Sequence, residues 1–145
     1  MNVRIKGQDK ILEKNVYNKY GCIGGNISLP LEWTEGPKST KSYVVTMYDP
    51  DAPNGWWHWV MYNIPSNIRE LKENQVPQGS MTIRNSYGEM NYGGPCPPIG
   101  SNHRYIITVY ALSVDSISIN DEFELESLLK KYTLESATKI LNYGR

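Results

Sequence analysis

The chain has 145 residues, and its 15 Lys and Arg residues balance 15 Asp and Glu residues. This length is typical of a single domain, residues 1–145, that can bury its own core. The balanced charge offers no basic face and argues against a nucleic-acid partner. No stretch approaches the roughly 20 apolar residues of a transmembrane segment. The N-terminus also lacks an apolar signal-peptide run, so we expect a cytoplasmic location.

The two cysteines, Cys22 and Cys96, lie far apart in the sequence. For a protein of a reducing compartment we expect two free thiols rather than a disulfide. The spacing contains no Cys-x-x-Cys element, which disfavours a zinc site.

The first half of the chain predicts strands separated by turns. Residues 10–20 are polar and read as a loop or an edge strand. A short strand is expected over Asn26–Trp33, where Pro30 restricts hydrogen bonding to one side. Ser42–Tyr48 is rich in β-branched and aromatic residues and predicts a strand that stops at Asp49.

Two further strands are expected in the middle of the chain. Trp57–Ile64 should alternate so that His58 shares a face with Val60, Tyr62 and Ile64. Residues 66–92 look irregular, with short strands near Met81–Ile83. The strongest pattern is His103–Leu112, whose two faces are both largely apolar, as in a central strand. One of these faces is expected to hold His103, Tyr105, Ile107, Val109 and Ala111.

The C-terminal part changes to helical spacing. Leu125, Leu128, Leu129 and Tyr132 fit an amphipathic helix that Asn120 or Asp121 can cap. Leu134, Ala137, Ile140 and Leu141 continue at helical spacing after a break near Thr133. Strands followed by one or two helices predict a β-rich α+β domain, a sandwich or barrel with helices packed at its end.

His103 and Tyr105 are two residues apart on one strand and therefore project from the same face. They follow a loop, residues 93–100, in which prolines fix the backbone and glycines permit unusual torsions. The pair could clamp an anion, and the loop could aim backbone N–H groups at an oxyanion. The alternative is a core pair of mutually satisfied side chains beside a rigid turn.

A second proline-locked segment is Asp49-Pro50-Asp51-Ala52-Pro53. Asp49 could accept a proton from an imidazole or a ligand amine, and Asp51 could pair with Arg104 as a structural tie. Turn formation is the alternative role for both acids. The Ala52–Pro53 bond is a candidate cis peptide that the sequence leaves open.

Two histidines and a carboxylate could also form a facial triad for iron, but the acid precedes a proline and no further ligand motif is visible. No Gly-x-Ser-x-Gly, Walker or dinucleotide motif is present, and Cys96 lies between two prolines. We therefore predict neither a metal nor a cofactor.

The chain resembles the phosphatidylethanolamine-binding protein (PEBP) family, also called Raf-kinase-inhibitor-like proteins, in its bacterial and archaeal branch. The matching segments appear in the family's order and are Asp49–Pro53, Gly55–Val60, Tyr92–Pro98 and His103–Tyr105. Weaker matches are Gly25–Trp33 and Asn142–Arg145. Leu29 departs from a frequent proline of the family, and Tyr132 from a helix histidine of many bacterial members.

The resemblance implies an antiparallel Greek-key β-sandwich with a C-terminal helix beside a ligand pocket. It also implies that the pocket takes phosphate-like and carboxylate-like anions, including phosphoethanolamine-type head groups. By position, the polar pocket residues are Asp49, His58, His103 and Tyr105, and the wall residues are Trp56, Cys96, Pro97 and Pro98. Asp51, Arg104 and Pro53 are assigned structural roles.

The expected function is therefore a non-enzymatic binding protein with a small, rigid anion pocket. Some family members regulate a kinase or a protease, so a protein partner of that kind is a second hypothesis. A small hydrolase that uses His103 as a base, assisted by Asp49 and His58, is the third. A homodimer is left open.

Overall fold

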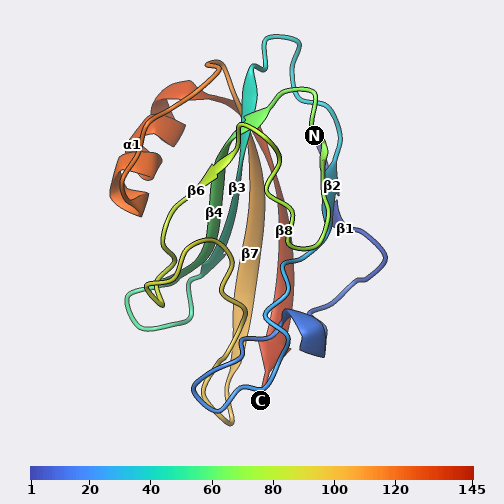
Figure 1. Cartoon of the computed structure of the whole chain (residues 1–145), viewed down its shortest axis with the longest axis vertical. Coiled ribbons are helices and arrows are strands. Elements are labelled where there is room, and N and C mark those ends of the chain that lie inside the picture. The colour runs from blue at the N-terminus through green and yellow to red at the C-terminus, as the bar shows by residue number, and fades with distance from the viewer.

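The computed structural model describes residues 1–145 as two antiparallel sheets and one α-helix (Figure 1). The small sheet has the order β1 (Val3–Ile5), β2 (Leu31–Trp33), β5 (Glu70–Leu71). The large sheet has the order β6 (Met81–Thr82), β4 (Trp56–Pro65), β3 (Ser42–Asp49), β7 (Asn102–Leu112), β8 (Thr133–Gly144). A short 3₁₀ helix covers Glu13–Asn15, and α1 covers Glu122–Tyr132. The expected β-rich sandwich with a C-terminal helix is confirmed.

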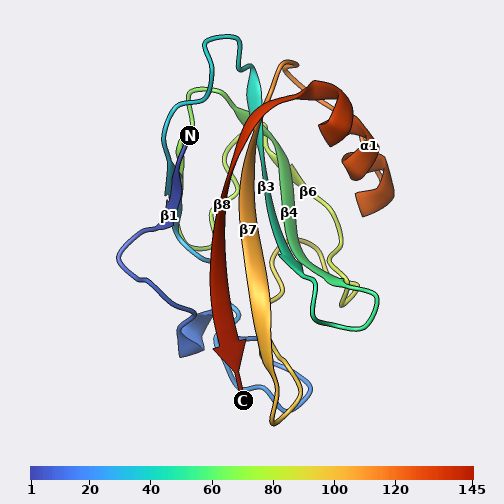
Figure 2. The same ribbon diagram turned by 180° about the vertical axis from the view of Figure 1, so that it is seen from behind.

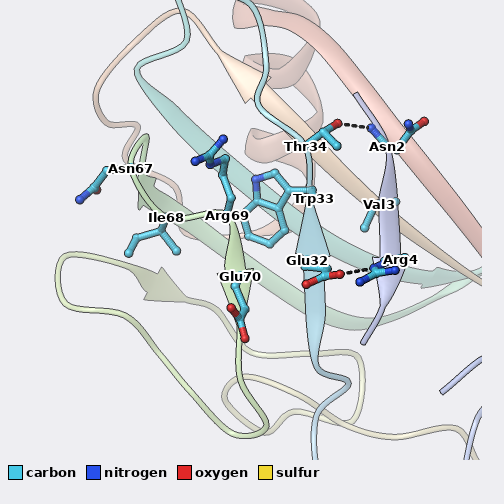
Figure 3. Close-up of a pocket in the computed structure, with 10 residues that line it drawn as sticks. All are labelled: Asn2, Val3, Arg4, Glu32, Trp33, Thr34, Asn67, Ile68, Arg69 and Glu70. Carbon is cyan, nitrogen blue, oxygen red and sulfur yellow. Dashed lines mark hydrogen bonds and ion pairs between the residues drawn. The ribbon is translucent and has the colours of Figure 1, made fainter. Parts of the chain in front are cut away.

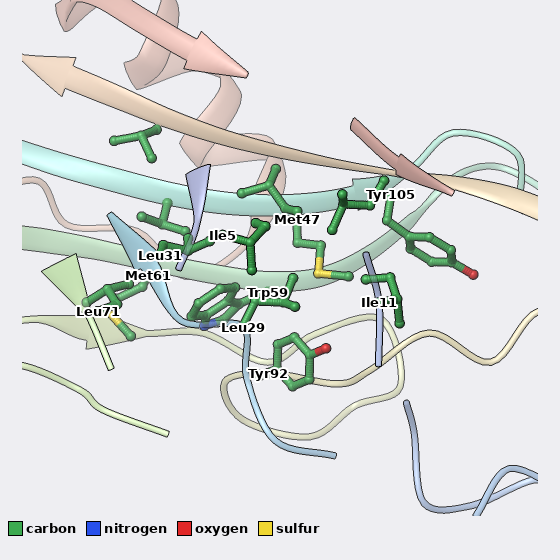
Figure 4. Close-up of a cluster of buried hydrophobic side chains, with 14 of the residues drawn as sticks. Ile5, Ile11, Leu29, Leu31, Met47, Trp59, Met61, Leu71, Tyr92 and Tyr105 are labelled. Atoms are coloured by element: carbon green, nitrogen blue, oxygen red, sulfur yellow. The ribbon is translucent and has the colours of Figure 1, made fainter. Parts of the chain in front are cut away.

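The main core lies between the two sheets. Apolar side chains alternate along each strand, so one face of each sheet can be buried against the other. Leu31 and Leu71 come from the small sheet, while Met47, Trp59 and Met61 come from the large one (Figure 4). The inner face of β7 carries the residues that its alternation predicted, with Tyr105, Ile107, Val109 and Ala111 all buried.

The helix covers the outer face of the large sheet. Leu125 and Leu129 pack there with Val44, Val60 and Leu112 in a second apolar cluster. The side chain of Asp121 caps the helix by accepting a hydrogen bond from the backbone N–H of Glu124 at 2.9 Å. This 11-residue helix is neither long enough nor apolar enough to cross a membrane.

The expected second helix over residues 134–141 is wrong, because these residues form β8. Ala137 and Leu141 are both buried, and a spacing of four residues fits one face of a helix and one face of a strand equally well. Pairing along the length of β7 decides between the two, from His103 with Tyr143 to Leu112 with Thr133.

The expected position of the helix beside the ligand pocket is also wrong. The end of α1 meets the Leu112 end of β7, where the backbone N–H of Ser113 donates to the carbonyl of Tyr132. The other end of β7, at His103, lies beside the C-terminus (Figure 2). Tyr132 therefore lies at the end of the sheet away from His103.

Other expectations hold with narrower bounds. The strand expected over 26–33 contracts to β2, although Leu29, Leu31 and Trp33 are all buried in the core as the alternation predicted. The irregular segment 66–92 contains β6 near the expected position, whereas β1 and β5 were not predicted. Both are only two or three residues long, too short to show a period.

The prediction of two free thiols is wrong, because Cys22 and Cys96 form a disulfide. Hydrogen bonds hold the two segments side by side: the N–H of Tyr17 donates to the Pro95 carbonyl at 3.0 Å, and the N–H of Gly94 donates to Asn26 Oδ1 at 2.7 Å. The two Cα atoms lie 6.1 Å apart, within the range that a disulfide bridges. The separation of 74 residues in the sequence gave no sign of this proximity.

Removing the disulfide should destabilise the protein. A crosslink over a loop this long limits the unfolded chain, so Cys22→Ser should lower the free energy of unfolding by about 2–4 kcal/mol. Urea unfolding measures the change, and thiol titration of the denatured wild type should find no free thiol. Two reactive thiols in freshly purified, unreduced protein would contradict the disulfide.

Candidate functional site

A cavity of about 190 Å³ opens where β3 ends and β4 and β7 begin. All eight residues predicted to bind or enclose a ligand line it, together with Pro53, which had been assigned a structural role. Ala52 and Tyr87 also line it and were not predicted. The full lining is Asp49, Ala52, Pro53, Trp56, His58, Tyr87, Cys96, Pro97, Pro98, His103 and Tyr105.

Strand pairing brings the two proline-locked segments together. Asp49, the last residue of β3, pairs with Trp56 at the start of β4. On its other side β3 pairs with β7, where Tyr48 lies opposite Ile106. The carboxylate and both imidazoles, distant in sequence, therefore reach one cavity.

The carboxylate of Asp49 is buried, with 2% of the residue exposed, and both of its oxygens are occupied. Oδ1 accepts hydrogen bonds from the backbone N–H groups of Asp51 at 2.8 Å and Ala52 at 3.2 Å. Oδ2 lies 2.6 Å from His103 Nδ1. Asp49 thus forms the turn of its own loop and also binds an imidazole, so the two alternatives left open by the sequence are both realised.

His103 is oriented by that carboxylate. Since a carboxylate only accepts hydrogen bonds, Nδ1 of His103 carries a proton and Nε2 is left for the cavity. In the imidazolium form the ring would present an Nε2–H donor, with its charge balanced by Asp49.

His58 is buried in a different environment. Its Nδ1 lies 2.7 Å from the carbonyl oxygen of Gly93, which fixes the proton on Nδ1. Burial lowers the pKa of His58 to about 4, and the Gly93 carbonyl and the Asp49 charge oppose this shift only in part. The ring is therefore neutral near neutral pH, with the lone pair on Nε2.

The face predicted for His58 is wrong. Val60 and Tyr62 belong to the outer cluster, whereas the His58 ring packs edge-on against Tyr105 on the inner side, with centroids 5.2 Å apart. The pairing shifts here, because Met47 pairs with Trp59 but Tyr48 pairs with Trp57. His58 is the extra residue of this β-bulge, which turns its side chain inward.

Two tyrosines complete the polar lining. Burial raises the pKa of Tyr105 well above its ordinary range, so its hydroxyl stays protonated and can donate. Figure 4 shows this ring at one end of the core with its hydroxyl directed away from the other core side chains. Tyr87 instead donates to the Gly94 carbonyl at 2.8 Å. Its position in an aperiodic segment gave no signal in the sequence.

The structural tie predicted between Asp51 and Arg104 is confirmed. Asp51 accepts from the Arg104 backbone N–H at 2.8 Å, from Nε at 3.1 Å and from Nη2 at 2.9 Å. These bonds hold the pKa of Asp51 at about 2. They join the loop after β3 to the start of β7, while the Ala52–Pro53 peptide is trans.

The loop 93–100 does not form the expected anion nest from its glycines. The N–H of Gly93 donates to the His58 carbonyl, that of Gly94 to Asn26, and that of Gly100 to the Arg145 carbonyl. The prolines have no N–H to offer. The loop therefore contributes a rigid wall to the cavity, and the N–H groups of its three glycines are spent on the protein.

A larger cavity of about 510 Å³ lies over the small sheet (Figure 3). Its charges largely neutralise one another: Arg4 pairs with Glu32, and Glu70 pairs with Lys6. The smaller cavity instead gathers buried titratable groups around one hollow, which is the usual mark of a functional site. We therefore place the candidate site there.

Comparison with known proteins agrees with the fold. Residues 7–144 match the family described as phosphatidylethanolamine-binding protein. The UPF0098 protein YbhB of Escherichia coli is 42% identical over 125 residues, which cover 81% of this chain and 79% of that protein. A UPF0098 protein of Aquifex aeolicus is 48% identical over 106 residues, which cover 69% and 62%.

Solved structures show the same likeness. The crystal structure of E. coli YbcL, described as a new member of the mammalian PEBP family, has a TM-score of 0.92 and 33% identity and covers 99% of this chain and 98% of its own. That of a putative PEBP homologue from Chlamydia trachomatis has a TM-score of 0.86 and 26% identity, with coverage of 99% and 97%. This chain belongs to the phosphatidylethanolamine-binding protein family, and membership supports a binding role in general.

The buried state of His58 predicts a pH dependence of stability. Its pKa is about 4 in the folded protein against an ordinary 6.5, so the unfolded chain binds the proton more tightly. The contribution of neutral His58 to the free energy of unfolding is fully present above pH 6.5, and it is lost as the pH falls through 4. The loss should be about 3 kcal/mol.

Urea unfolding at several pH values measures this effect. The slope of stability against pH over this window should be shallower in His58→Gln than in the wild type, because the variant lacks the titrating ring. Equal slopes in the two proteins would show that His58 is not held neutral by burial.

Proposed function

We propose that this protein binds small oxyanions, phosphate-like groups above all, in the cavity between Asp49, His58, His103 and Tyr105. The observation that carries the proposal is the His103 imidazole, held at 2.6 Å by the buried Asp49 carboxylate beside the Tyr105 hydroxyl. This arrangement holds the Tyr105 hydroxyl and, in its imidazolium form, the Nε2–H of His103 in fixed positions, so little ordering is required on binding.

The size of the cavity supports a head group or a free anion rather than a large ligand. Its volume of about 190 Å³ is below the range of roughly 300–1,000 Å³ usual for drug-sized ligands. Phosphate, a carboxylate or phosphoethanolamine would fit, while lipid tails would remain outside. Charge-assisted hydrogen bonds of about 1.5–3 kcal/mol each must offset the cost of association. We therefore expect affinities between about millimolar and micromolar.

The proposal assigns binding rather than catalysis. The one cysteine of the cavity is held in a disulfide, and both oxygens of Asp49 already accept hydrogen bonds from the protein. A hydrolase with His103 as base is the alternative. Turnover of phosphomonoesters or carboxylic esters that disappears in His103→Asn would favour that alternative.

The disulfide also bears on location. Disulfides persist mainly in oxidising compartments, so Cys22–Cys96 supports an oxidising compartment over the expected cytoplasm. Trapping of thiols in intact cells would decide between the two. Regulation of a kinase or a protease stays a prediction, to be tested by comparing the partners captured by the wild type and by a cavity variant.

Phosphate titration tests the proposed function. The variant His103→Asn keeps an amide N–H near the position of Nδ1, where it can still donate to Asp49. It removes Nε2, the ring nitrogen that faces the cavity. Loss of one charge-assisted hydrogen bond should weaken phosphate binding by about 10- to 100-fold. Calorimetry or NMR titration measures the affinity.

Lys41→Gln is the matched control. It removes one positive charge far from the cavity, because Lys41 is exposed and its backbone N–H donates to the carbonyl of Leu112, at the other end of β7. Its phosphate affinity should equal that of the wild type. An equal loss in both variants would reduce the effect to net charge and contradict a site at His103.

A further inference from the structure

Once His103 is protonated, the two imidazoles of the cavity face a ligand with opposite hydrogen-bonding character. His103 has its Nδ1 on a carboxylate and can present a donor at Nε2 when it is protonated. His58 has its Nδ1 on the Gly93 carbonyl in a buried setting, and its free Nε2 carries a lone pair. A bound anion must therefore satisfy an acceptor as well as donors.

The acceptor at His58 is fixed by its surroundings. The Gly93 carbonyl cannot donate, so the tautomer with the proton on Nδ1 is the only neutral one that forms this 2.7 Å bond. The neighbouring Gly94 carbonyl accepts a hydrogen bond from Tyr87 at 2.8 Å and, like that of Gly93, acts to raise the pKa of His58 against the larger effect of burial. Protonation of Nε2 would place a second charge beside His103 in a buried site, and burial opposes it.

From this geometry we infer that the cavity selects oxyanions that keep a proton of their own, which His58 Nε2 accepts. The ligand class is then inorganic phosphate and phosphomonoesters in the form that retains a P–O–H group. Fully deprotonated anions would point an oxygen lone pair at the lone pair of Nε2. The inference rests on the proposed oxyanion site and narrows its ligand class.

Phosphate and sulfate provide a closely matched test. Both are tetrahedral oxyanions of similar size, but near neutral pH phosphate retains at least one proton and sulfate retains none. Dimethyl phosphate, a monoanion without a P–O–H group, separates the missing proton from the total charge. The wild type should bind phosphate at least about tenfold more tightly than either of the other two anions, because a buried polar group left unpaired is strongly disfavoured.

The variants assign the preference to one ring. His58→Gln puts an amide near the position of Nε2, and an amide can rotate to donate or to accept. The ratio of phosphate to sulfate affinity should fall to within about threefold, mainly through a gain in sulfate binding. His103→Asn, in contrast, should weaken both anions and leave their ratio unchanged.

A direct readout does not depend on affinity. In ¹⁵N NMR spectra, Nε2 of His58 should show the chemical shift of an unprotonated, pyridine-type nitrogen in the free protein, and this signal should move on addition of phosphate but not of sulfate. A protonated Nε2 in the free protein would overturn the inference.

The outcomes separate the two claims. Equal binding of phosphate and sulfate by the wild type would overturn the selectivity and leave the oxyanion site standing. A preference that persists in His58→Gln would overturn the assignment to His58. Absence of binding for all three anions at tens of millimolar would overturn the proposed function together with the inference.

Discussion

The geometry of the site depends on the hydrogen bonds that the buried carboxylate of Asp49 accepts. One oxygen closes the turn that follows β3, and the other holds the imidazole of His103 on the neighbouring strand. A carboxylate removed from water is stable only if its oxygens find donors, and here the protein itself supplies them. The Asp51–Arg104 pair repeats the connection at the surface, between the same loop and the same strand.

The β-bulge at His58 gives the site its second imidazole. Without the extra residue, regular alternation would place this ring with Val60 and Tyr62 beneath the helix. With it, two consecutive residues of β4 turn toward the inner side: Trp59 enters the core, and His58 reaches the cavity. The two imidazoles differ in their surroundings, because a charged carboxylate can balance an imidazolium at His103 and only a neutral carbonyl lies against Nδ1 of His58.

The sequence predicted those parts of the fold that follow from local pattern. β-branched runs located β3 and β7, and alternation along β7 correctly placed His103 and Tyr105 together on the inner face. The eight residues that the family resemblance assigned to a ligand pocket all line one cavity. Local pattern alone pointed to the two proline-locked segments and to the shared face of His103 and Tyr105.

The failures share one physical cause, which is that long-range pairing decided the outcome. Ala137 and Leu141 fit both periods, and only the adjacent β7 makes their segment a strand. The bulge at His58 arises from the register in which β3 and β4 pair. The Cys22–Cys96 disulfide arises from the contact between two loops that are distant in the sequence. Tyr87 reaches the cavity from a segment with no period at all.

A crystal structure of the protein grown with phosphate would test the central claim most directly. The account predicts one phosphate in the cavity, with oxygens about 3 Å from Nε2 of both histidines and from the Tyr105 hydroxyl. A cavity that holds only water, with phosphate bound elsewhere or not at all, would contradict it.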